Sequence, residues 1–146
     1  MGPYRVLTDA INIKDAYIIN IAIRFSILVK KNYNKQEVLL RCIQAVKDYF
    51  DTDKWQINQP IILSDLAYEI SLIDGVNNVV PPEDNNPTNQ IVAIQNKFKT
   101  ANGYSGNIYD IAGATRKSVV YPSLDPAIFE VKFPDLDIVG KVVGDI

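Results

Sequence analysis

The residues with the clearest chemical potential in this chain are two pairs of closely spaced aspartates. Asp51 and Asp53 flank a threonine, and Asp135 and Asp137 flank a leucine. An Asp-x-Asp pair can contribute to a divalent-cation site, but hard cations need several further oxygen ligands. Neither pair has the additional acidic positions or the glycine of an EF-hand loop. Solvated loop carboxylates are the favoured interpretation, and cation binding at either pair stays open.

Other sets of catalytic residues are missing from the sequence. The chain has no histidine, so Ser-His and Cys-His pairs cannot form, and the commonest general base is absent. It has no GxxxxGK[ST] or GxGxxG phosphate-binding motif. The single cysteine, Cys42, has apolar neighbours typical of a buried thiol. We therefore predict that the protein is not an enzyme and uses no cofactor.

Length and composition are typical of one soluble globular domain. The chain has 146 residues, of which 47% are hydrophobic and 22% are charged, with a net charge of -2. That balance supplies no excess of positive charge for a nucleic-acid partner. Polar residues interrupt the longest apolar stretch, residues 17–29, which is also too short to span a membrane. No membrane or small-molecule partner is expected, and no signal peptide is recognisable.

Residues 17–29 carry the strongest strand pattern. Every odd position is apolar, and polar residues such as Arg24 and Ser26 fall on even positions. This alternation predicts a long strand with one face on the core. Ile18, Ala22 and Leu28 make the even face less polar than usual. That second face could be covered by another chain.

Two helices and a strand are predicted after this strand. Apolar residues at helical spacing indicate a helix over residues 35–51, with Asn34 as its N-cap and Glu37 three positions later. Ser64-Asp65 predicts the N-cap of a shorter helix that ends at Gly75. Residues 76–80 read as a strand. The order predicts an α+β fold, a strand-helix-helix-strand unit with both helices on one face of a small sheet.

The second half of the chain is predicted to be irregular and rich in β-structure. A loop over residues 81–90 separates it from the compact first part, residues 1–80. Residues 91–146 should pack on that first part as one domain. Predicted extended segments cover residues 91–99, 107–111, 118–121, 128–133 and 138–143. The alternating segment 128–133 is either an edge strand that binds a partner or a closing strand of this domain.

Several short motifs resemble a known family. The stretch from Val38 to Val80 looks like the C-terminal region of baseplate J-like proteins, with Asp74-Gly75-Val76 at the end of its second helix. The second half resembles the C-terminal end of the large baseplate wedge subunit of myoviruses. Its matching motifs are Gly103-Tyr104-Ser105, Asn107-Ile108-Tyr109-Asp110-Ile111, Tyr121-Pro122-Ser123-Leu124-Asp125-Pro126 and Ile128-Phe129-Glu130-Val131-Lys132. Together the motifs cover about residues 15–143.

The resemblance implies a structural role in a contractile phage tail. Members of the family self-associate and bind other wedge proteins, which implies a homodimer within a baseplate assembled in the host cytoplasm and carried in the virion. The resemblance supplies no catalytic residues. The alternative is a small α+β module that binds a ligand or nucleic acid, with Lys97-Phe98-Lys99 as a candidate basic patch. The residues expected at a protein interface are Tyr104, Tyr109, Tyr121, Phe129, Val131 and Phe133.

Overall fold

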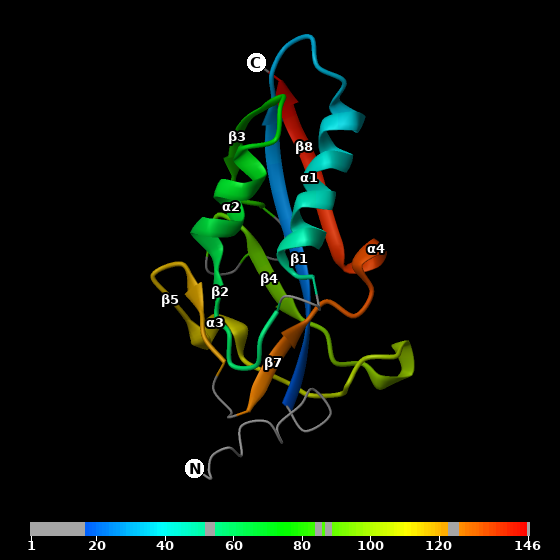
Figure 1. Cartoon of the computed structure of the whole chain (residues 1–146), viewed down its shortest axis with the longest axis vertical. Coiled ribbons are helices and arrows are strands. Elements are labelled where there is room, and N and C mark those ends of the chain that lie inside the picture. The colour runs from blue at the N-terminus through cyan, green and yellow to red at the C-terminus, as the bar shows by residue number, and fades with distance from the viewer. Residues whose placement is uncertain (1–16, 52–54, 84–85, 87–88, 123–125, 146) are drawn as a thin grey trace.

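The computed structural model describes residues 17–51, 55–83, 86, 89–122 and 126–145. It has the predicted α+β class, with two principal helices and a mixed sheet (Figure 1). The elements in chain order are β1 (Tyr17–Val29), α1 (Lys35–Tyr49), β2 (Ile61–Ile62), α2 (Leu63–Ser71), β3 (Val76–Val80), β4 (Ala93–Asn96), η3 (Thr100–Asn102), α3 (Ile111–Ala114), β5 (Thr115–Arg116), β6 (Val119–Val120), β7 (Ala127–Glu130), α4 (Pro134–Asp137) and β8 (Ile138–Asp145).

Strand β1 is the central strand of the main sheet, and its bounds are those predicted from the alternating pattern. Its odd-numbered side chains from Ile19 to Val29 are all buried in the core. Burying a side chain of this size contributes roughly 1.5–3 kcal/mol. These six residues therefore account for a large part of the apolar burial that holds the sheet to its helices.

The four neighbours of β1 lie along two edges. Strands β3 and β4 are antiparallel to β1, whereas β7 and β8 are parallel to it. Ile23 pairs with Ile94 of β4 and with Ile138 of β8, so these two strands lie on opposite edges. Strand β7 pairs with the first four residues of β1. Three of the four neighbours thus come from the second half of the chain.

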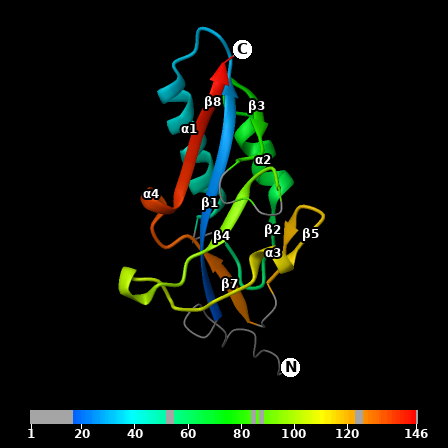
Figure 2. The same ribbon diagram turned by 180° about the vertical axis from the view of Figure 1, so that it is seen from behind.

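Helices α1 and α2 cover one face of this sheet, as predicted (Figure 1). The view from behind shows the other face without a helix over it (Figure 2). Helix α1 begins at the predicted cap, where the Glu37 amide donates to Asn34 Oδ1 at 3.1 Å. Gly140 of β8 lets this layer pack closely, because a Cβ there would lie 2.4 Å from the Phe25 ring.

The start of α2 differs from the prediction. The helix begins at Leu63 with Ile62 in the N-cap position, and no side chain caps it, so Ser64 lies in the first turn. The reason is tertiary: Ile61 and Ile62 form β2 and pair with β6, which leads the chain directly into the helix. Gly75 does adopt a left-handed φ of 100°, but it lies three residues after the C-cap, Leu72.

The second half contains most of the predicted strands in shorter form. The predicted segments 91–99, 118–121 and 128–133 become β4, β6 and β7, and 138–143 becomes the longer β8. The extended segment expected over 107–111 has no regular structure, and Ile111 begins the short helix α3. Strands β2, β6 and β5 form a second small sheet, which the sequence did not indicate.

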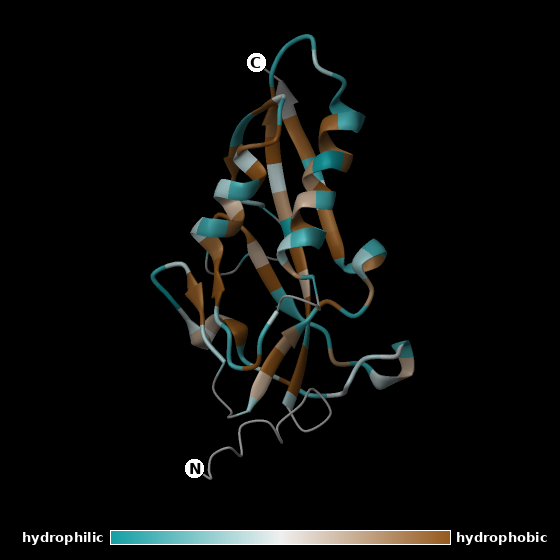
Figure 3. Cartoon of the chain, in the orientation of Figure 1, coloured by the Kyte–Doolittle hydropathy of each residue, from teal (hydrophilic) through white to brown (hydrophobic). Residues whose placement is uncertain are grey.

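One hydrophobic core joins both halves of the chain. In Figure 3 the strands of the main sheet are mostly brown, whereas helices α1 and α2 carry bands of teal and brown. The core contains Phe25 and Leu66 from the first part and Phe129 and Ile138 from the second. The loop over residues 81–90 therefore does not divide the core.

Candidate protein-protein interface

Two of the six residues expected at an interface are buried inside this chain. Phe129 is 2% exposed and Val131 is 7% exposed. Strand β7 pairs in parallel with the start of β1, which places Phe129 opposite Ile19. Of the two roles considered for this segment, the structure has the closing strand. The expectation that these two side chains form a binding surface is therefore wrong.

Tyr104 and Phe133 are also engaged within the chain. Their rings meet edge to face with centroids 5.4 Å apart. The Tyr104 hydroxyl donates to Asp137, at 2.8 Å to Oδ1 and 3.0 Å to Oδ2. Desolvation, followed by the bond to Asp137 and its negative charge, raises the pKa of Tyr104. The pair connects the segment after η3 to α4.

Tyr109 and Tyr121 contact each other, and Tyr109 also lies against β7. The Tyr109 hydroxyl donates to the backbone oxygen of Tyr121, and its ring lies 6.0 Å from that of Phe129. Tyr121 is 46% exposed, whereas the Tyr109 side chain is half-buried. Tyr121 is thus the one exposed side chain of the six predicted residues, and the six form no common surface.

Asn20 lies at an even position of β1, but it is buried and joins three segments. Its Nδ2 donates to Glu130 Oε1 at 2.7 Å, and its Oδ1 accepts from the Ser105 amide at 2.7 Å. Its backbone oxygen accepts from the Lys97 amide at 2.8 Å. The sequence did not indicate this role, because an asparagine that alternates with buried apolar residues along a strand ordinarily faces water.

The side chains of Asp135 and Asp137 do not converge on a common site. The exposed Asp135 carboxylate pairs with Lys47 Nζ at 2.6 Å, whereas the buried Asp137 carboxylate accepts from Tyr104, so the two engage different partners. Asp53 lies outside the described residues. Within the described ranges, no three acidic, cysteine or histidine side chains gather where they could hold a metal ion.

Cys42 lies in the core between α1 and the sheet, as its apolar neighbours predicted. Burial raises the pKa of its thiol from 9.0 to about 12. Below pH 9 the thiol is protonated in both the folded and the unfolded chain, so its ionisation does not affect stability. Above pH 9 the thiol ionises in the unfolded chain but not in the folded one, so the free energy of unfolding falls as the pH rises from 9 towards 12.

We expect the buried thiol to be unreactive in the folded protein. At pH 8 an aromatic disulfide reagent should modify Cys42 at least about 100-fold more slowly than in the urea-unfolded chain, because the thiolate is the reacting species. Absorbance of the released thiolate measures both rates. Equal rates in the two states would show that Cys42 is accessible and reactive.

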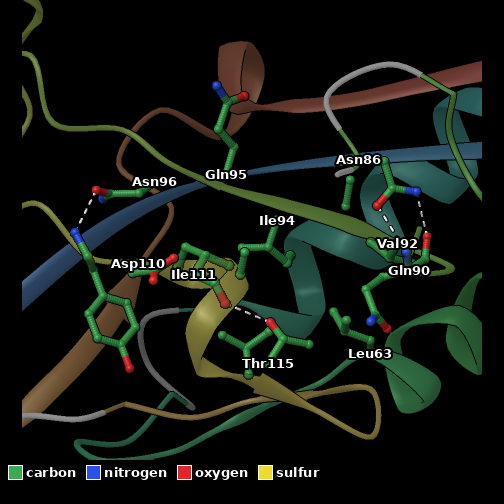
Figure 4. Close-up of a pocket in the computed structure, with 14 residues that line it drawn as sticks. Leu63, Asn86, Gln90, Val92, Ile94, Gln95, Asn96, Asp110, Ile111 and Thr115 are labelled. Carbon is green, nitrogen blue, oxygen red and sulfur yellow. Dashed lines mark hydrogen bonds between the residues drawn. The ribbon is translucent and has the colours of Figure 1, made fainter. Parts of the chain in front are cut away.

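A cavity of about 300 Å³ lies between β4, α3 and the start of α2 (Figure 4). Its lining mixes apolar side chains such as Val92 and Ile111 with polar ones such as Asn86 and Thr115, which fits the alternative of a ligand-binding module. Several of these polar side chains are nevertheless already bonded within the chain. Asn86 bonds Gln90 through both its amide atoms, Asn96 accepts from the Tyr109 amide at 2.9 Å, and Thr115 donates to Ile111. A ligand would have to displace these bonds to be recognised.

The face of the sheet opposite the helices is another candidate surface. Parallel strand pairs are normally covered on both faces, but here the parallel pair β1–β8 has helices on one side only. Val139 and Val143 of β8 are 38% and 46% exposed, and Leu136 beside them is 72% exposed. We call this surface the open face, formed by the half-buried Ala22, Arg24 and Leu28 of β1 with Leu136, Val139, Lys141 and Val143, while Ser26 on the same face of β1 is buried.

Two shallow grooves follow the open face. One of about 460 Å³ runs between β8 and Val80, and a smaller one lies between β4 and α4. Both grooves are lined by Arg24 and Val139. The only signal of this surface in the sequence was the apolar character of Ile18, Ala22 and Leu28 on the second face of β1. That signal did not identify the part contributed by β8.

Comparison of the chain with known protein families, curated proteins and solved structures found no match. Within the part of the chain that the structure describes, no helix is long and apolar enough to cross a membrane.

Proposed function

We propose that this chain is a structural assembly module, part of a wedge subunit of a contractile phage tail baseplate. In this proposal it has no catalytic role and binds copies of itself and neighbouring wedge proteins through the open face. The observation that carries the assembly role is the uncovered parallel pair β1–β8 with its exposed valines. Contiguous exposed apolar patches on soluble domains mark interaction sites.

The baseplate assignment is supported by the resemblance of the sequence motifs. Asp74-Gly75-Val76 forms the connection from α2 to β3, the helix-to-strand junction expected for that motif. The buried Gly75 lies against Tyr33 and Val38, where an added Cβ would approach their side chains to 2.7 Å. The motif thus has a structural reason to carry glycine. Location in the virion, after assembly in the host cytoplasm, is part of the same proposal.

Replacing Val139 on the open face tests the assembly role. Val139→Asp should weaken self-association by at least about tenfold, because it puts a charge into an apolar contact worth roughly 1.5–3 kcal/mol per side chain. Sedimentation equilibrium at high protein concentration measures the shift towards the 16.4 kDa monomer.

Ile108→Asp is the matched control, since Ile108 is 68% exposed and lines neither the grooves of the open face nor the surface between α1 and α2. It should leave association unchanged. A wild-type chain that stays monomeric at millimolar concentration and binds no neighbouring wedge protein would refute the proposal. The nucleic-acid alternative instead predicts salt-sensitive binding of a labelled oligonucleotide.

A further inference from the structure

A further groove lies on the opposite side of the molecule, between α1 and α2. It encloses about 950 Å³, and its walls include Tyr49 on α1 and Tyr68 on α2. Tyr68 and Leu72 are each 60% exposed at this groove. The helix side thus carries an apolar strip with no partner among the described residues, which we call the helix groove.

The helix groove is strongly acidic. Four carboxylates line it, and its one basic side chain, Arg41, is already paired with Glu37 on the same helix. Burial is the largest cause that raises the pKa of the adjacent Tyr49 hydroxyl, and the negative charges of Asp65 and Glu69 raise it further. The side chains of Asp65 and Glu69 are exposed and lie one helical turn apart on α2. The four carboxylates of the groove are Asp48, Asp65, Glu69 and Asp74.

The open face has the opposite charge balance. Arg24, Lys97 and Lys141 line its grooves, against Glu83 and the buried Asp137. Neither Arg24 nor Lys141 has an ion-pair partner in the described parts of the chain. Arg24 lies on β1, where it pairs with Val139 of β8. Lys141 lies on β8, where it pairs with Ser26 of β1. Basic groups therefore border the apolar side chains that need a partner.

We propose that the helix groove of one copy docks on the open face of the next, so that copies of this chain join front to back. This inference rests on the proposed self-association and names the surface that covers the open face. Two open faces related by a two-fold axis would bring Arg24 and Lys141 towards their own copies, whereas the helix groove offers carboxylates. A front-to-back contact is heterologous and builds closed rings or open filaments.

Charge reversal in pairs tests the contact. The groove variant carries Asp65→Lys and Glu69→Lys, and the face variant carries Arg24→Glu and Lys141→Glu. Each variant alone should associate about tenfold more weakly than wild type, since like charges then meet at every contact. An equimolar mixture should recover association, because the reversed groove of one variant matches the reversed face of the other. Sedimentation velocity over a range of concentrations measures all three samples.

Arg116→Glu with Lys117→Glu is the matched control, because it makes the same charge change as the face variant, at the exposed end of β5 and the turn after it. It should associate like wild type. Thermal unfolding checks that every variant folds, and Lys141→Glu alone replaces the face variant if the half-buried Arg24 position does not tolerate glutamate. Raising the salt concentration should weaken the wild-type contact.

The outcomes separate this inference from the proposed function. A groove variant that associates as strongly as wild type overturns the front-to-back contact and leaves assembly through the open face standing. Failure of the mixture to recover association overturns it as well. A wild-type chain that never associates and binds no wedge protein refutes the proposed function, and the front-to-back contact with it.

Discussion

Phe129→Ala is expected to lower the free energy of unfolding by about 3–5 kcal/mol, the usual cost of removing a buried phenylalanine. Phe129 is 2% exposed, lies opposite Ile19 in the β1–β7 pair and contacts the ring of Tyr109. Its removal leaves a cavity at the junction of the two halves of the chain. Losses of this size are a large fraction of the total stability of a small domain.

Urea denaturation followed by circular dichroism measures the loss. Tyr121→Ala is the control, because Tyr121 belongs to the same predicted set but is 46% exposed, and its replacement should cost about 0.5 kcal/mol or less. A Phe129→Ala protein of wild-type stability that no longer binds a partner would restore the original interface interpretation of this residue.

Asn20→Ala is expected to lower the free energy of unfolding by about 3 kcal/mol. The substitution removes a hydrogen bond to the Glu130 carboxylate and leaves the Ser105 amide without its acceptor. Hydrogen bonds to charged groups contribute roughly 1.5–3 kcal/mol, and an unsatisfied buried donor costs about 1–3 kcal/mol. Water that enters the site would offset part of this loss.

Denaturant unfolding gives the overall change, and hydrogen exchange at the Ser105 amide reports the local one. Exchange there should accelerate more than exchange in the centre of β1. Gln95→Ala is the control, because Gln95 is exposed on the same face and pairs with Ala22. Equal stability of the Asn20→Ala and Gln95→Ala proteins would show that the buried connection contributes little.

Local patterns determined the elements of the first half. The alternation over residues 17–29 predicted β1 with its observed bounds, because one buried face demands a period of two. The capping interaction of Asn34 with Glu37 spans three residues and depends on nothing farther away. The α+β class and the placement of both helices on one face followed from the order of these elements.

The tertiary structure decided which positions are inside and which surface remains open. Asn20 and Phe129 are buried because β1 pairs with strands more than 75 residues distant, at a register that no local pattern specifies. The same pairing brings Val139 and Lys141 beside Arg24 and creates the open face. Local sequence patterns determined that β1 has one apolar face and one face of mixed polarity. Only the packing of β8 and the two helices decided how much of the mixed face stays exposed.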